Sequence, residues 1–237
     1  MQAPLAEFFG TALLLFLGNG VVANAILSKT KGHGAGWMAI NFGWAMAVFV
    51  AVLVTARFSA AHLNPAVTFA LALKSGQWGN VFPFILAQLA GAMLGSFGVW
   101  VMHKAHFDAT ADSNTKLAVF CTAPAIPNTL QNLFSEAAGT FVLVTAVLHL
   151  SAPEARIGSI EALPIALVVL AIGLCLGGPT GYAINPARDL GPRIVHFLLP
   201  IRGKCDSNWA YSWIPVLGPL AGSLLAVWVF QFLTGAA

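Results

Sequence analysis

Long apolar runs limit this chain to a small set of structures. Five runs reach the roughly 20 residues that a helix needs to cross a bilayer core of about 30 Å, and a sixth is shorter but uncharged. In chain order, the six runs cover residues 5–27, 37–56, 81–102, 130–150, 162–178 and 213–233. Charged residues make up 8% of the chain, well below the roughly 25% typical of a soluble domain. The sequence therefore predicts an all-α membrane protein with six transmembrane helices.

The rest of the composition argues against several classes of function. The net charge is +3 and the basic residues form no run, so we expect no nucleic-acid partner. No basic region precedes the first apolar run, so we expect that run to stay in the mature protein rather than act as a cleaved signal peptide. The sequence has no Ser/His/Asp set, no phosphate-binding loop and no metal-ligand spacing. We therefore expect no enzyme, no cofactor and no metal site.

Two sequence patterns occur once in each half of the chain. Glu-x-x-Gly-Thr begins the first apolar run at Glu7 and the fourth at Glu136, and Asn-Pro-Ala follows later in each half. Each half holds three spans and one short apolar element, and an odd number of spans gives the two halves opposite orientations in the membrane. This is the inverted repeat of many transport proteins. We expect one domain made of two repeats and a connecting loop: about 1–105, about 130–237 and 106–129.

The short apolar elements are half the length of a span. Residues 65–73 would form about 14 Å of helix, which is half a membrane. The segment after Asn185 is similar, although Pro192 makes its helical regularity uncertain. Non-helical backbone at membrane depth is tolerated only where it is buried in protein or lines a watery cavity. We expect two re-entrant half-helices that meet near the midplane beside a pore.

Asn-Pro-Ala at the start of a half-helix has a direct physical interpretation. Proline suits the first helical position, and asparagine caps the exposed N–H groups with its side-chain oxygen. Its NH₂ donors are then free to face the pore beside the positive helix ends. Such a site attracts an oxygen atom, repels cations and breaks the hydrogen-bonded file of water that a proton needs. A single copy is usually an ordinary helix start, but one copy per inverted half indicates a pore. The residues of the two copies are Asn64, Pro65, Ala66, Asn185, Pro186 and Ala187.

Segments 59–68 and 181–193 resemble the two signature sequences of the aquaporin family. The resemblance extends over all six spans, both half-helices and both Glu-x-x-Gly-Thr patterns. It implies the aquaporin fold, a single channel domain and a homotetramer in the lipid bilayer. It also implies a plasma (cytoplasmic) membrane location with both termini in the cytoplasm. The distribution of basic residues points the other way, because the inner loops hold only Arg57, Lys74 and Arg156 while eight basic residues lie on the outer side.

Asp189, directly after Asn-Pro-Ala-Arg, resembles the glycerol-conducting branch of that family, and Arg193 and Pro215 fit the same branch. The resemblance therefore implies a passive channel, a glycerol uptake facilitator or aquaglyceroporin, for glycerol and similar small neutral solutes together with water. Protons and ions would be excluded. The alternatives are the same fold tuned to water alone, or to undissociated lactic acid or urea. A coupled secondary transporter is a further alternative, against which no acid or histidine stands beside the Asn pair to bind a coupling ion.

By spacing from the two motifs, the selectivity filter of the family maps onto Trp44, Gly173, Tyr182 and Arg188. An arginine near membrane depth is functional by default, and its fork of donors can hold two neighbouring hydroxyls. Trp44 and Tyr182 would form an apolar corner for the carbon face of a polyol. Gly173 would open room where water channels typically have histidine. Tyr182 stands where phenylalanine is common, so its hydroxyl either narrows the filter or adds a polar contact.

Other residues are assigned supporting roles. Backbone carbonyls freed from helix bonding would supply acceptors along the path at Ala60, Ala61, His62, Leu63, Tyr182, Ala183 and Ile184. The resemblance implies that Glu7 and Glu136 hold the re-entrant loops, with proton relay as the alternative, and that Asp189 is structural. His62 is either a hydrogen-bonded structural residue or a pore-lining, pH-sensitive one. Cys121 and Cys205 fall in loops on the same side, where a disulfide is conceivable.

Overall fold

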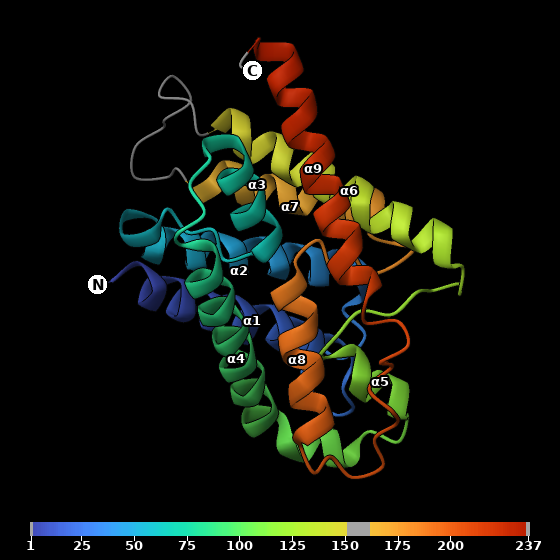
Figure 1. Ribbon diagram of the computed structural model, residues 1–237. Coiled ribbons are helices and arrows are strands. Elements are labelled where there is room, and N and C mark those ends of the chain that lie inside the picture. Colours follow the sequence, from blue (N-terminus) through green and yellow to red (C-terminus); the bar gives the residue numbers. More distant parts are fainter. Residues whose placement is uncertain (1, 151–161, 236–237) are drawn as a thin grey trace.

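The computed structural model describes residues 2–150 and 162–235, and this part of the chain contains helices and no strand (Figure 1). The membrane-length helices are α1 (Ala3–Ile26), α2 (Gly36–Ser59), α4 (Val81–Ala109), α6 (Thr129–Leu150) and α9 (Ile214–Thr234). The shorter helices are α3 (Pro65–Ser75), α5 (Ser113–Ala118), α7 (Ala162–Leu176) and α8 (Pro186–Leu198). The expected all-α class is therefore confirmed for the described residues.

The predicted spans agree with the helices with two differences. Five helices are long and apolar enough to cross a membrane, whereas α7 has 15 described residues and directly follows 151–161, which lie outside the described part. Helix α4 runs to Ala109 instead of ending near residue 102, and Lys104 pairs with Asp108 one turn later at 3.1 Å. The predicted connecting loop at 106–129 therefore begins with helix and also contains α5.

Both re-entrant half-helices are present. Helix α3 has 11 residues and α8 has 13, so each spans about 16–20 Å. Pro192 does not interrupt α8, which corrects the doubt about its regularity. Proline costs a helix the hydrogen bond to the carbonyl four residues earlier, here that of Arg188. The surrounding protein holds this helix in place, because Gly191 lies against Ala92 of α4.

The two repeats pack in the same way. Helix α4 packs on α1 and α9 packs on α6, each through glycines that allow the backbones to touch. A methyl group added to Gly91 would lie 2.2 Å from the carbonyl oxygen of Phe8, and one added to Gly222 would lie 2.2 Å from that of Ala137. Phe8 and Ala137 each follow the glutamate of their repeat. The repeated sequence therefore produces a repeated helix contact.

The half-helices join the repeats to each other. Helix α3 of the first repeat contacts α9 of the second, and α8 of the second contacts α4 of the first. The hydroxyl of Ser223 donates to the carbonyl of Ala66 at 3.0 Å across this contact. Figure 1 shows α3 and α8 between the longer helices, so their N-termini point into the centre of the bundle.

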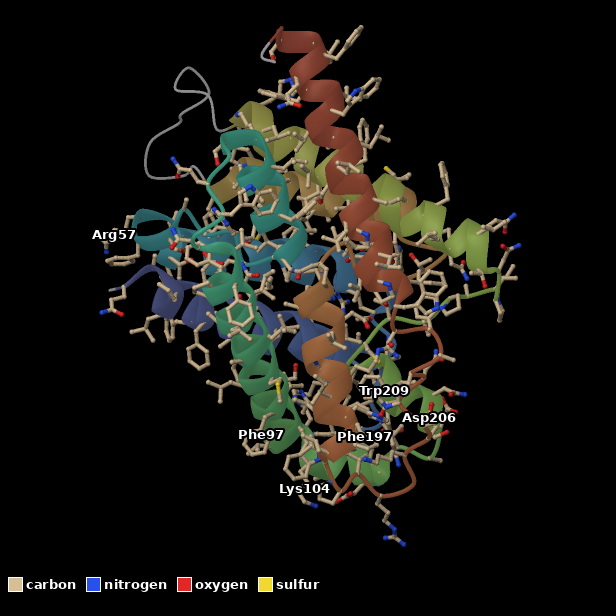
Figure 2. The ribbon with its side chains drawn as sticks, viewed as in Figure 1. Arg57, Phe97, Lys104, Phe197, Asp206 and Trp209 are labelled. Atoms are coloured by element: carbon tan, nitrogen blue, oxygen red, sulfur yellow. The ribbon has the colours of Figure 1, made fainter. Side chains whose placement is uncertain are left out.

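The molecule has two distinct ends. Figure 2 places Arg57 at one end and Lys104, Asp206 and Trp209 at the opposite end. The start of α1 and the end of α9 both lie toward the Arg57 end (Figure 1), where Lys74 also stands over the ring of Phe230 at 4.4 Å. The start of α1 and the end of α9 thus lie on one side, as the expected six spans would require.

Burial explains part of the unusual charge distribution. Of the basic residues counted on the outer side, Lys116, Arg188 and Arg193 are buried within the protein. Lys204 donates to the carbonyls of His196, Phe197 and Leu199 at 2.7 Å each, so it caps the end of α8. These residues lie inside the protein or bind a helix end, so they are not free charges at the membrane surface. On the inner side, Arg156 lies outside the described residues.

Candidate pore and selectivity filter

Each Asn-Pro-Ala motif begins its half-helix as predicted. The side-chain oxygen of Asn64 accepts from the N–H of Ala66 at 2.9 Å, and that of Asn185 accepts from Ala187 at 3.0 Å and Arg188 at 3.1 Å. The proline follows at the first helical position in both helices. The capping prediction is confirmed in both repeats.

The amide donors of the two asparagines are not wholly free, which corrects one expectation. Asn64 Nδ2 donates to the carbonyl of Ile184 at 2.8 Å, and Asn185 Nδ2 donates to the carbonyl of Leu63 at 2.9 Å. Each motif therefore binds the loop in front of the other. One N–H of each amide remains for a molecule in the pore, because an amide has two. The carbonyls of Leu63 and Ile184 each keep one lone pair.

The loops before the half-helices have an unusual backbone. Their non-glycine residues with positive φ are Ala60, Ala61, Leu63, Tyr182 and Ile184. The left-handed region costs such residues roughly 1–2 kcal/mol each. Ala60, with φ 62°, is the C-cap of α2, a position at which glycine is preferred. This conformation leaves the carbonyls out of regular helix bonding, as predicted, and it needs support from the surrounding protein.

That support comes from Glu7 in the first repeat. Both its oxygens are buried, and they accept from the N–H of His62 at 3.0 Å and of Leu63 at 2.7 Å. The hydroxyl of Ser59 and the amide of Gln88 donate to the same carboxylate at 2.5 and 2.8 Å. A carboxylate that accepts several hydrogen bonds is strongly held.

Glu136 makes the equivalent contacts in the second repeat. Its oxygens accept from the N–H of Ala183 at 3.0 Å and of Ile184 at 2.8 Å, and the Thr180 side chain also bonds to it. Ser59 and Thr180 each precede the asparagine of their motif by five positions. Neither glutamate lines the cavities described below. The geometry favours the structural role over proton relay.

Two cavities run through the bundle and meet at three side chains. One cavity of about 410 Å³ extends past the two asparagines to Ala56 and Leu150. The other, of about 650 Å³, opens toward Asn114 and Asp206, and Figure 2 shows Asp206 at the end opposite Arg57. The residues that line both cavities are Trp44, Tyr182 and Arg188. The structure thus brings three of the four predicted filter residues together at a constriction.

The constriction combines polar and apolar groups. The guanidinium carbon of Arg188 lies 4.2 Å from the centre of the Trp44 ring, which is a cation–π contact. Arg188 stands at the third position of α8, one turn from the capping asparagine. The ring of Tyr182 meets the edge of Trp37 with centroids 5.8 Å apart. Hydrogen-bond donors of Arg188 and aromatic carbon of Trp44 and Tyr182 therefore lie next to one another at the constriction.

Gly173 does not line either cavity, although it was expected to open the filter. A methyl group at this position would lie 2.1 Å from Asn41 Oδ1 and 2.8 Å from Tyr182 Cζ. The space that glycine leaves is therefore filled by these two side chains. The glycine therefore lets the Asn41 and Tyr182 side chains pack against it in the wall.

His62 has the hydrogen bond expected of a structural residue and also lines the cavity, while its pH sensitivity stays a prediction. Its ring lines the cavity on the Arg57 side, and its Nδ1 bonds to the hydroxyl of Thr68 at 3.1 Å. The ring also meets Phe84 edge-on, with centroids 5.2 Å apart. It is a hydrogen-bonded residue that also faces the path.

A buried ion pair joins Asp189 and Arg193 of α8. Both residues were identified from the sequence, whereas the other residues that they bind were not. Asp189 Oδ1 lies 2.7 Å from Arg193 Nη2, and both side chains are fully shielded. Asp189 Oδ2 accepts from both the N–H and the hydroxyl of Thr122, while Arg193 Nη1 donates to the carbonyls of Ser207 and Asn208. The pair therefore ties α8 to two distant loops. No local pattern around Thr122 or Ser207 marks these contacts.

Cys121 and Cys205 are free thiols that both line the outer cavity. Burial, with a smaller contribution from the charge of Asp189, raises the pKa of the Cys121 thiol. Cys121 therefore stays protonated and unreactive at neutral pH. No disulfide joins the two residues in this structure.

Residues 1–230 match the family described as Major intrinsic protein. The chain belongs to this family. A major intrinsic protein from Streptococcus pneumoniae strain R6, named Glycerol uptake facilitator protein, is 52% identical over 98% of this chain and 99% of its own length. A more distant relative from Lactiplantibacillus plantarum, named D/L-lactic acid transporter, is 38% identical over 94% of each chain.

A solved structure agrees with this assignment. The aquaglyceroporin from Plasmodium falciparum superposes with a TM-score of 0.86 at 28% identity, covering 99% of this chain and 98% of that one. The aquaporin fold expected from the resemblance is confirmed. Members of the major intrinsic protein family are membrane channels and not enzymes, so the chain is a multi-pass membrane channel protein.

Proposed function

We propose that this major intrinsic protein is a passive channel for glycerol and similar small neutral solutes, with water passing the same pore. The observation that carries the proposal is the constriction shared by the two cavities, where Arg188 faces Trp44 and Tyr182. A polyol has hydroxyls along one edge and carbon along the other. The guanidinium fork pairs with two hydroxyls, and the aromatic rings take the carbon face.

The paired asparagines act as the second selective element in this proposal. Each presents one free N–H at the positive end of a half-helix, so an oxygen atom is bound there and a cation is repelled. A solute or water molecule that accepts from both amides cannot at that moment continue a chain of proton transfer. The proposed channel therefore excludes protons and ions by the mechanism expected from the sequence.

Backbone acceptors complete the path. We assign this role to the carbonyls of 60–63 and 182–184, of which Leu63 and Ile184 also hold the opposing asparagines. Glu7, Glu136 and Asp189 act from behind as structural residues. The whole chain, 1–237, forms one channel domain from the inverted repeats at about 1–105 and 130–237.

Stopped-flow light scattering on proteoliposomes tests the proposal. Vesicles are shrunk by a hyperosmotic step of glycerol, and the expected result is fast shrinkage followed by fast re-swelling, with no change in the signal of an internal pH dye. Empty vesicles and vesicles with the Arg188→Val variant are the controls. Fast shrinkage without re-swelling would overturn the glycerol assignment and leave a water channel.

Undissociated lactic acid is the second candidate solute, favoured by the relative named D/L-lactic acid transporter. Lactic acid also has oxygens on neighbouring carbons and one methyl group, so the same constriction suits it. The same vesicles are challenged with lactic acid near pH 4, where about half of the acid is neutral, and with urea. Faster re-swelling with lactic acid than with glycerol would reverse the order of the two candidates.

We further propose that the channel is a homotetramer in the cytoplasmic membrane with both termini in the cytoplasm. Large apolar side chains are exposed on α1, α2, α4 and α9, where a bilayer or neighbouring subunits would cover them. Native mass spectrometry in detergent tests the tetramer. The orientation is tested in a variant whose three native cysteines are replaced, by introducing one cysteine either next to Arg57 or at Asp206 and labelling from outside intact cells. Only the cysteine at 206 is expected to react.

A further inference from the structure

Two buried polar atoms beside the constriction lack a hydrogen-bond partner within the described part of the chain. They are the hydroxyl of Tyr182 and Oδ1 of Asn41. Asn41 belongs to α2, three positions before Trp44, and its side chain is fully buried. Buried polar groups are almost always paired, so two unpaired atoms in one place call for an explanation.

The two atoms face the same small space in the pore wall. The ideal methyl position of Gly173 lies 2.1 Å from Asn41 Oδ1 and 2.8 Å from Tyr182 Cζ, the carbon that carries the hydroxyl. Asn41 Nδ2 donates to the carbonyl of Trp37 at 2.9 Å. This bond fixes the amide so that its oxygen, an acceptor only, turns toward Gly173 and the tyrosine.

The tyrosine ring lies in this wall and its hydroxyl points away from the path. The methyl position of Gly177 is 2.3 Å from Tyr182 Cδ1, so the ring extends along the groove between Gly177 and Gly173. Trp37 closes the groove, with its Nε1 donating to the carbonyl of Gly173 at 3.2 Å. The ring of Tyr182 lines both cavities, whereas its hydroxyl oxygen is inaccessible to water.

We propose that Asn41 is a positioning residue that acts through Tyr182 to set the width of the constriction. No hydrogen bond joins Asn41 Oδ1 and the tyrosine hydroxyl as the side chains stand in this structure. A bond from the hydroxyl to this oxygen would pair both atoms and hold the hydroxyl in the wall behind Gly173. The pore is then lined at this position only by carbon atoms of the ring, as it would be if residue 182 were phenylalanine. This inference rests on the proposed conduction of glycerol, because it explains how a channel with tyrosine in its filter admits a carbon chain.

The alternative partner for the hydroxyl shows why the contact matters. Arg188 is the charged group beside the ring, and it can only donate. A tyrosine released from Asn41 turns its hydroxyl oxygen toward that guanidinium. The hydroxyl would then stand in the path, occupy the donors meant for the solute, and narrow the opening for a polyol more than for water.

A double-mutant comparison tests the proposal. Asn41→Ala is measured against the wild type, and Asn41→Ala/Tyr182→Phe against Tyr182→Phe, as the ratio of glycerol to water permeability in proteoliposomes. We expect Asn41→Ala to lower the ratio about fivefold when tyrosine is present, the effect of losing one hydrogen bond in a site without water. In the phenylalanine background we expect a change of less than about twofold. Asn41→Ser, which is too short to reach the ring, replaces Asn41→Ala if the alanine variant does not fold.

Asn19→Ala is the matched control. Asn19 is also fully buried, also has an unpaired Oδ1, and donates to Ser96 at 3.0 Å away from both cavities. Its removal costs the fold a comparable bond and is expected to leave the permeability ratio unchanged. An equal fall of the ratio for Asn41→Ala in both backgrounds, or no fall in either, overturns the proposal.

Failure of the proposed function is recognised separately. If wild-type vesicles pass water but no glycerol, the glycerol proposal fails whatever the variants do. The same comparison is then made on water permeability, which a hydroxyl turned into the path lowers as well. If Asn41→Ala lowers water permeability in the tyrosine background and not in the Tyr182→Phe background, the positioning role is supported. An equal effect in both backgrounds overturns it.

Discussion

The amide of Asn64 donates to the carbonyl of Ile184 at 2.8 Å, so a residue of the first repeat directly holds the loop of the second. Asn185 makes the reverse contact with Leu63 at 2.9 Å. The two Asn-Pro-Ala motifs are therefore not structurally independent. A change at either asparagine alters the cap of its own helix and the position of the opposite loop.

Substitution of Asn185 by aspartate separates these roles. Aspartate keeps an oxygen that caps α8, but it places a negative charge opposite the Leu63 carbonyl and removes both N–H donors. We expect cations to enter, seen as faster dissipation of a sodium or proton gradient in vesicles containing the variant. Asn132→Asp, at a buried asparagine of α6 outside the pore, is the control. An unchanged gradient in Asn185→Asp vesicles would contradict the proposed selectivity.

The two buried glutamates are expected to differ in their effect on stability. Glutamine at either position places an NH₂ group against backbone N–H donors, and each hydrogen bond to a charged group is worth about 1.5–3 kcal/mol. Glu7→Gln should destabilise more than Glu136→Gln, because Gln88 donates to Glu7 in addition, whereas the bond from Ser59 has its counterpart in the bond from Thr180 to Glu136. Thermal unfolding in detergent measures both. Equal losses would contradict this ranking, and unfolding temperatures unchanged from the wild type in both variants would contradict the structural role.

The Asp189–Arg193 pair is expected to contribute strongly to stability. Asp189→Asn leaves the guanidinium without its charged partner, and breaking a buried pair costs about 3–5 kcal/mol. Asp108→Asn provides the matched control, because it breaks the pair of Lys104 and Asp108 at 3.1 Å, whose side chains are 60% and 45% exposed. An exposed pair contributes at most about 1 kcal/mol. Similar unfolding temperatures for the two variants would refute this view of the ion pair.

Gly173→Ala tests the finding that the glycine seats the tyrosine. The added methyl group meets Asn41 and Tyr182, so we expect lower stability and lower glycerol flux with water flux retained. Gly20→Ala in α1 is the control, since nothing lies within 4 Å of its added methyl group. Alanine there should stabilise the helix by about 1 kcal/mol. If Gly173→Ala behaved like Gly20→Ala, the wall described here would be wrong.

Much of the pore was predictable because its main sequence motifs occur twice, once in each half of the chain. The apolar runs predict the spans, and the repeated Glu-x-x-Gly-Thr and Asn-Pro-Ala patterns predict the half-helices and their caps. These features depend on residues close in sequence, such as Asn185 and the N–H of Ala187. The shared constriction of Trp44, Tyr182 and Arg188 also followed from spacing, through the resemblance to the aquaporin family.

Other features were decided only by the tertiary structure. Three sets of contacts join residues far apart in the chain: those of each asparagine with the opposite loop, that of Gly173 with Asn41, and those of Arg193 with Ser207 and Thr122. Sequence patterns indicate which helix faces are apolar and where helices start, because these features depend on residues close together in the chain. Which buried donor meets which acceptor depends on how the helices pack, and only the assembled bundle brings those atoms within reach.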